Sequence, residues 1–141
     1  MKVKIYLLVV SALLGTYLPA NAQNAYQRQW QAFQQQLLQD NISVSISPED
    51  ALALILHQEP IVWKQGGKEG GVSGTVIVGF EISRKGEVLH PMVLAGPSQL
   101  QRPVLDAVRK YKFNPYKMGD EAITVGASLT IDASNSGGTS N

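Results

Sequence analysis

Alternating apolar residues mark residues 74–83 as the most strand-like stretch of the chain. Apolar side chains that recur at every second position share one face of a β-strand. The face predicted to meet a core carries Val76, Val78, Phe80 and Ile82, and the opposite face carries Thr75, Ile77, Gly79, Glu81 and Ser83. Gly86 supplies the backbone freedom of a short turn, and a second β-like run follows at residues 88–95. We therefore expect a hairpin whose first strand is central.

A third long strand is predicted at residues 121–132, where apolar residues again alternate with small or polar ones. Its buried face would carry Ile123, Val125, Ala127, Leu129 and Ile131, and we expect the other face, with Thr124, Gly126, Ser128 and Thr130, to be uncrowded. The strand at residues 88–95 contains Pro91, which lacks an amide hydrogen and so belongs at a sheet edge. Sheet edges offer unpaired amides and carbonyls to an extended peptide.

Two helices and a short strand complete the predicted fold. Ser47 and Pro48 are typical of a helix start, and the helix at residues 51–57 is apolar almost all round, so we expect it to be largely buried. A second helix is predicted at residues 99–112, regular from near Arg102 because Pro103 would kink it, and a short strand at residues 42–46. The fold class is α+β, a small three-stranded antiparallel sheet with helices packed on one face. The predicted shared core is Val76, Val78, Phe80, Ile82, Val104, Val108, Leu129 and Ile131.

The N-terminus is typical of a secretory signal peptide, since Lys2 and Lys4 precede an apolar run and an Ala-x-Ala site ends at Ala22. We expect cleavage after Ala22, which removes two of the 12 basic residues and none of the 11 acidic ones and leaves a net charge of −1. A near-neutral exported chain is a poor candidate for nucleic-acid binding. The remaining residues suffice for one small domain, and we expect no stable membrane insertion once the signal is removed.

Residues 23–45 form a Gln-rich extension ahead of the domain predicted at residues 46–132, and residues 133–141 have the composition of a disordered tail. Within the extension, the spacing of Tyr26, Trp30, Phe33 and Leu37 predicts a helix with one narrow apolar seam. Two interpretations stay open. The helix packs back on its own domain or frays, or it docks a partner or a second copy of the chain.

The residues give little support for catalysis. The chain has no cysteine, which excludes disulfides and thiolate chemistry, and its two histidines, His57 and His90, share no metal-ligand spacing. The glycine-rich connector at residues 59–74 lacks the pattern of a phosphate-binding loop. We therefore expect no enzyme activity, no cofactor and no metal site.

Several segments carry a resemblance to a known family: Gly71-Val72-Ser73-Gly74-Thr75-Val76, Gly86-Glu87-Val88, the stretch from Leu105 to Pro115 with its aromatic-basic-aromatic end, and Gly119. Over residues 46–132 the chain resembles the C-terminal domain of TonB, the periplasmic end of the energy transducer for outer-membrane transport. The resemblance implies a periplasmic protein whose partner is an outer-membrane receptor or another periplasmic protein. It departs from the family at Trp63-Lys64, where many relatives have Tyr-Pro.

In that family the last strand takes up the short TonB box of a receptor. The resemblance therefore places the partner-binding residues at Glu121, Ala122, Ile123, Thr124, Val125, Gly126, Ala127, Ser128, Leu129, Thr130 and Ile131. Because a cleaved chain without a long Pro-rich spacer is unsuited to carry force, we expect a free-standing peptide-binding member. The alternatives are a transducer anchored by an uncleaved signal and a structural or inhibitory periplasmic domain. Formation of a homodimer stays open.

Overall fold

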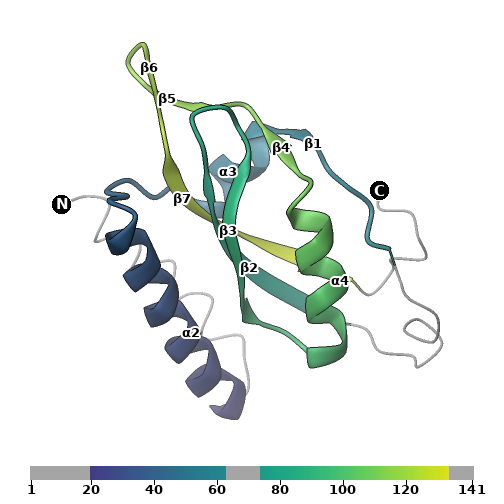
Figure 1. Ribbon diagram of the computed structural model, residues 1–141. Coiled ribbons are helices and arrows are strands. Elements are labelled where there is room, and N and C mark those ends of the chain that lie inside the picture. Colours follow the sequence, from purple (N-terminus) through teal and green to yellow (C-terminus); the bar gives the residue numbers. More distant parts are fainter. Residues whose placement is uncertain (1–19, 63–73, 134–141) are drawn as a thin grey trace.

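The computed structural model describes residues 20–62 and 74–133. The signal peptide, most of the glycine-rich connector and the C-terminal tail that the sequence predicts lie outside these residues, apart from their ends. The described elements, labelled as in Figure 1, are α2 (Ala20–Gln39), α3 (Pro48–Leu54), β1 (Ile55–His57), β2 (Thr75–Ile82), β3 (Val88–Ala95), α4 (Ser98–Val108), β4 (Lys112–Phe113), β5 (Tyr116–Met118), β6 (Glu121–Ile123) and β7 (Val125–Asp132).

An antiparallel sheet in the order β3-β2-β7 forms the centre of the fold, and it confirms the predicted α+β class with β2 in the middle. β2 and β7 pair without interruption from Thr75 opposite Asp132 to Ile82 opposite Val125. The β2–β3 turn contains Gly86 at φ 83°, and a Cβ there would collide with the carbonyl of Phe113. Glycine at this position therefore lets the turn lie against β4.

One face of the sheet carries the main hydrophobic core, and α3 and α4 pack on this face. All eight residues of the predicted core belong to this one buried cluster, so the predicted inward face of β2 is confirmed. The aromatic side chains Phe80 and Phe113 meet in the same cluster, with ring centroids 5.5 Å apart. The alternation of apolar residues located this face because only one side of each strand meets these helices.

The opposite face of the sheet is covered by α2, which crosses it as the dark blue helix in Figure 1. The predicted seam is confirmed, since Tyr26, Trp30, Phe33 and Leu37 are buried against Ile77 of β2 and Leu94 of β3. Of the two interpretations, the structure has the one in which the helix packs back on its own chain. The sheet with α3 and α4 on one face is as predicted, and α2 adds a second layer, from a segment that was predicted to lie outside the domain.

The helix predicted at residues 51–57 is wrong in its second half. It ends at Leu54, because Ile55–His57 is extended as β1 and pairs with β4. The Asn114 amide donates to the Leu54 carbonyl at 2.7 Å, and this bond stabilises the change from helix to strand after Leu54. Burial was also overestimated, since side chains of Leu52 and Leu56 are exposed and Ala51 is the buried residue of α3. The predicted cap is correct, with the Asp50 amide donating to Ser47 Oγ at 2.9 Å.

Three other boundaries differ from the prediction. α4 begins at Ser98, one residue before the predicted start, continues through Pro103, and ends at Val108 rather than at residue 112. The strand predicted at residues 42–46 is a single parallel bridge between Ser45 and Gly126. The long last strand is two strands, because β6 turns back through Gly119 at φ 66° to pair with β5, and β7 starts after Thr124.

Candidate functional site

The outer edge of β7 is the most regular strand edge in the described structure. In an antiparallel ladder, successive residues direct their amide and carbonyl groups to alternate sides of the strand. The Gly126 amide donates to the Val44 carbonyl and the Gly126 carbonyl accepts from the Ile46 amide, both at 2.9 Å, so the groups of Gly126 point away from β2. By the same alternation, the backbone groups of Ser128 and Thr130 also point away from β2.

Beyond Gly126 this edge is buried at Ser128 and exposed at Thr130. Among the described residues, the outward backbone groups of Ser128 and Thr130 have no strand partner. Thr130 is exposed, whereas Ser128 as a whole residue, backbone included, is only 4% exposed. The C-terminal half of β7 therefore presents one exposed residue, Thr130, with outward amide and carbonyl groups, which is the feature that strand addition requires.

The structure divides the predicted partner-binding residues into two groups. Glu121, Ala122 and Ile123 lie in the β5–β6 hairpin, which projects from the top of the molecule in Figure 1. Thr124 lies between β6 and β7. The others lie in β7: Val125, Gly126, Ala127, Ser128, Leu129, Thr130 and Ile131.

The second face of β7 is more crowded than predicted. A Cβ at Gly126 would lie 2.9 Å from both Leu37 and Ser45 side-chain atoms, and Ser128 is buried. The prediction of an uncrowded face is wrong at these two residues, and at Gly126 the cause is the Leu37 side chain of α2 and the Ser45 side chain of the segment after α2. At Thr130 the face is exposed as expected.

The other edge of the sheet, along β3, is a poorer template for an added strand. Its pairing with β2 shifts register twice, and His90 has a left-handed backbone with φ 49°. Pro91 follows directly and has no amide to donate. The predicted edge position of this proline strand is confirmed, and its irregularity is typical of edges protected from further pairing.

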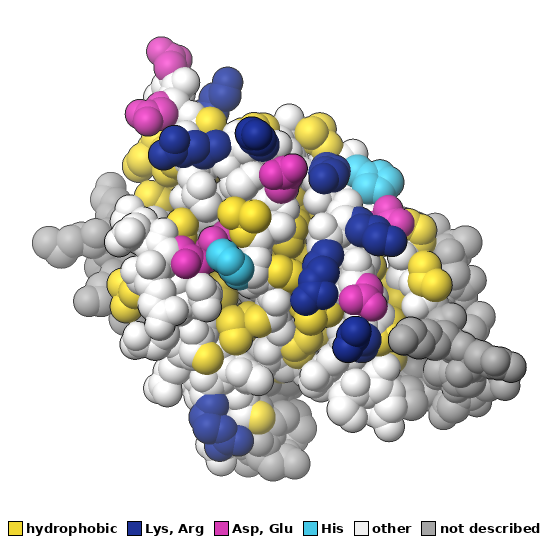
Figure 2. Space-filling model, in the orientation of Figure 1, with side chains coloured by type: hydrophobic (Ala, Val, Ile, Leu, Met, Phe, Trp, Pro, Cys, Tyr) yellow, Lys and Arg dark blue, Asp and Glu magenta, His cyan; other side chains and the backbone are white. Residues whose placement is uncertain are grey.

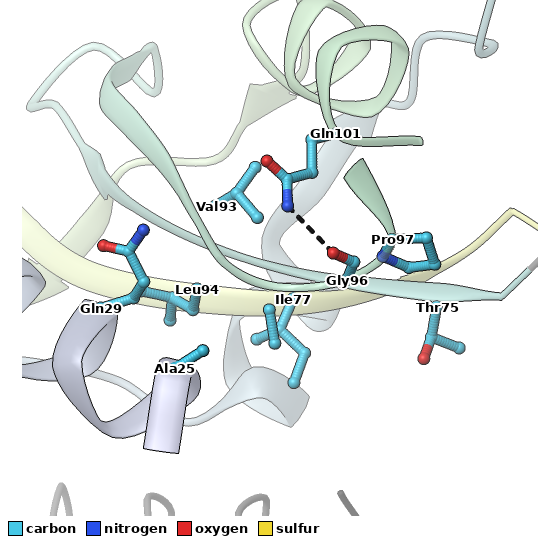
Figure 3. Close-up of a pocket in the computed structure, with 10 residues that line it drawn as sticks. Ala25, Gln29, Thr75, Ile77, Val93, Leu94, Gly96, Pro97 and Gln101 are labelled. Atoms are coloured by element: carbon cyan, nitrogen blue, oxygen red, sulfur yellow. Dashed lines mark hydrogen bonds between the residues drawn. The ribbon is translucent and has the colours of Figure 1, made fainter. Parts of the chain in front are cut away.

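A groove of about 490 Å³ lies between α2 and the end of β3 (Figure 3). Its walls include Ala25 and Gln29 from α2, Ile77 from β2 and Leu94 from β3. Gln101 Nε2 donates to the Gly96 carbonyl at 2.9 Å, so this polar group is already bonded within the chain. No charged side chain lines the groove among the described residues, and it lacks the convergent polar groups of a cofactor site.

A polar cluster lies where α2, β2 and β3 meet, and it consists of Asp40, Glu81 and His90. His90 Nδ1 lies 3.1 Å from Asp40 Oδ2 and 3.4 Å from Glu81 Oε1. Burial, and after it the neighbouring Asp40 carboxyl, raise the pKa of Glu81 to about 7. Hydrogen bonding to Glu81 and then to Gln36 lowers the pKa of Asp40.

Sequence reasoning did not find this cluster. It placed Glu81 on the face of β2 opposite the predicted core, and it compared the histidines only with each other. The missing signal was the left-handed residue at position 90, which alternation along a strand cannot reveal.

Charge does not single out a binding site on the face shown in Figure 2. In the view of Figure 2, lysine and arginine side chains are interleaved with acidic ones and with apolar patches. Such mixing creates little long-range field to attract a charged partner. The strand edge is therefore the stronger candidate for recognition.

A family comparison covers much of the described domain. Residues 66–132 match the family model described as the Gram-negative bacterial TonB protein C-terminal. This segment is of the TonB C-terminal family. The match includes β2, β3, α4 and β7, and it confirms the resemblance noted in the sequence.

Other comparisons add the following. The solution NMR structure of the Pseudomonas aeruginosa TonB C-terminal domain is similar, with 27% sequence identity and a TM-score of 0.47, over 56% of this chain and 82% of that chain. A search of curated proteins gave no match. Within the described residues, no helix combines the length and apolar character needed to cross a membrane.

Proposed function

We propose that the TonB C-terminal family segment is a periplasmic peptide-binding module. It binds an extended segment, such as the TonB box of an outer-membrane receptor, by strand addition to the outer edge of β7. The module acts without catalysis, and it follows a signal peptide that is cleaved after Ala22. Its role belongs to energy-coupled transport across the outer membrane, which is the process associated with TonB.

The observation that carries this proposal is the regular pairing of β7. β7 keeps an uninterrupted register with β2 and has outward backbone groups at Ser128 and Thr130. Each of these residues has one outward amide donor and one outward carbonyl acceptor, and Thr130, which is exposed, offers them directly to an incoming strand. Main-chain hydrogen bonds then supply affinity with little dependence on the peptide's sequence.

The apolar face of β7 makes the edge rigid. Leu129 is fully buried and Ile131 nearly so, and both belong to the core beneath the sheet. A template held by its own core is ordered before the peptide arrives, so less conformational entropy is lost on binding. The β3 edge lacks this regularity, which favours β7 as the place of addition.

The test is a proline at Thr130. The Thr130 amide points away from β2, so the substitution Thr130→Pro removes an outward donor without removing a bond of the β2–β7 ladder. We expect affinity for TonB-box peptides, measured by isothermal titration calorimetry, to fall about tenfold, as the loss of one main-chain hydrogen bond predicts.

Thr130→Val is the matched control, because it keeps the amide and changes the same exposed side chain. It should bind within about twofold of the native chain. Circular dichroism must show both variants folded. If Thr130→Val loses binding while a folded Thr130→Pro still binds, the side chain rather than the backbone is recognised, and strand addition at β7 is refuted.

A further inference from the structure

Three side chains with metal-ligand chemistry converge from three elements of the fold. Asp40 follows the last residue of α2, Glu81 lies in β2 and His90 in β3. One donor atom from each lies within 4.8 Å of the other two. They form a compact group on the face of the sheet that α2 covers.

Glu81 is the group that makes this cluster unusual. Its side chain is 2% exposed, and Oε2 has no hydrogen-bond partner among the described residues. A buried carboxylate is costly unless a donor or a cation satisfies it. The carboxyl group reaches the rest of the cluster through Oε1, which faces His90 Nδ1.

The backbone of β3 is distorted at the point that brings His90 to Glu81. Gly79 pairs with Met92 and Glu81 with Leu89, so both His90 and Pro91 stand opposite Phe80. This extra residue is a β-bulge, and His90 adopts φ 49° within it. Bulges re-aim side chains, and strained backbone is common at binding sites.

We propose that Asp40, Glu81 and His90 bind one divalent transition-metal ion, of which Zn²⁺ is the representative. An imidazole nitrogen and two carboxylate oxygens are ligands that Zn²⁺ accepts at about 2.0–2.2 Å, usually in a tetrahedron. Two ligand atoms of such a tetrahedron lie roughly 3.4 Å apart. The separations of 3.1 Å and 3.4 Å from His90 Nδ1 agree with this geometry.

The surroundings support the same assignment. Gln36 Nε2 donates to Asp40 Oδ2 at 2.9 Å, and such hydrogen bonds orient metal-binding carboxylates. The His90 side chain is 57% exposed, so water can reach the remaining coordination position. Ca²⁺ fits poorly, because it takes six to eight oxygen ligands and this group includes an imidazole.

A bound ion would connect α2 to the sheet. Asp40 stands at the end of α2, whereas Glu81 and His90 belong to two paired strands. An ion that requires all three binds the docked arrangement more tightly than any state in which α2 has separated, and so it stabilises that arrangement. This inference is independent of the proposed peptide binding at β7.

The experiment is a titration of the chelator-treated, full exported chain with ZnCl₂, followed by calorimetry and by thermal unfolding. We expect one saturable site and a rise in the melting temperature. The variant is His90→Asn, because asparagine tolerates a left-handed backbone better than other polar residues. It should weaken zinc binding at least tenfold and abolish the thermal shift.

His57→Asn is the matched control. His57 is the other histidine. It is exposed, and its Nε2 lies 2.8 Å from Glu59 Oε1, so the pair represents a surface site where zinc would bind nonspecifically. Its replacement should leave zinc affinity unchanged, and MgCl₂ should give no thermal shift with the native chain.

Glu81→Gln keeps the shape of the ligand and removes its charge, so it provides a second variant if His90→Asn fails to fold. It should also lose zinc binding. The proposal is overturned if the native chain shows no saturable binding, if zinc stabilises the native chain and the folded His90→Asn or Glu81→Gln variant equally, or if His57→Asn alone removes the effect.

Discussion

Gly79 and Gly126 explain how an aromatic-rich helix can lie so close to the sheet. A Cβ at Gly79 would lie 3.0–3.1 Å from ring carbons of Phe33, and one at Gly126 would lie 2.9 Å from Leu37. Both are tighter than ordinary van der Waals contact. Glycine in a strand costs some stability, and here that cost is offset by the packing of α2.

We predict that Gly79→Ala destabilises the protein by about 1–3 kcal/mol, the usual cost of overpacking. The measurement is urea unfolding of the native chain, the variant, Phe33→Ala and the double mutant. Because Phe33→Ala removes the ring, the same alanine should cost much less in that background. Equal costs in both backgrounds would show that the contact with Phe33 is not the cause.

Phe80 is the residue on which the main core depends most directly. It is fully buried, and its ring packs in a tilted arrangement against that of Phe113. We predict that Phe80→Ala lowers the free energy of unfolding by roughly 3–5 kcal/mol. The exposed Leu56, at 64% exposure, serves as the control, and Leu56→Ala should change stability by about 0.5 kcal/mol or less. A Phe80→Ala loss below about 1 kcal/mol would contradict the observed burial.

At the scale of elements, α2 contributes to a core of its own. Its seam packs with Ile77 and Leu94, and no residue of α2 belongs to the main buried cluster. We predict that deletion of residues 23–39 leaves cooperative unfolding intact at lower stability. It should also increase self-association, because Ile77 and Leu94 become exposed. Denaturant unfolding and light scattering measure the two effects.

A deletion variant that is unfolded in buffer would show that the two cores form one cooperative unit. The natural comparison is a chain in which Trp30 alone is replaced by alanine. That variant keeps the helix and should lose part of the stability without the self-association.

The long elements could be predicted from the sequence, whereas the short ones could not. The strands that contain Val78 and Leu129 could be predicted, because burial of one strand face makes apolar residues alternate along the sequence. β1 and β4 depend instead on each other, over a long separation in the chain, and nothing local at Ile55 distinguishes a strand from another turn of helix.

The candidate sites divide in the same way. The exposed side chain of Thr130 follows from alternation, whereas the edge position of its strand was expected from the family resemblance. Coverage of Gly126 by Leu37 and Ser45 depends on how α2 and the segment after it are placed against the sheet. The contact between Asp40 and His90 depends on the position of α2 and on the β-bulge in β3. Neither feature produces a recognisable pattern in the sequence.

At the scale of the whole molecule, the sheet lies between two helical layers, with α2 on one side and α3 and α4 on the other (Figure 1). β2 is the strand they share most fully, since seven of its eight residues are buried. It supplies Val78 and Phe80 to one core and Ile77 to the other. A disturbance in either layer therefore reaches the strand that positions β7.

The bridge from Val44 and Ile46 to Gly126 makes the chain its own competitor for the β7 edge. A tethered segment competes at an effective concentration that reaches the millimolar range for short flexible links. A peptide that pairs only at the exposed Thr130 meets no such competitor, whereas one that extends to Gly126 must first displace it. Lengthening a peptide in that direction should therefore bring little or no gain in affinity. The segment from Val44 to Ile46 thus limits the length of the strand that can be added to β7.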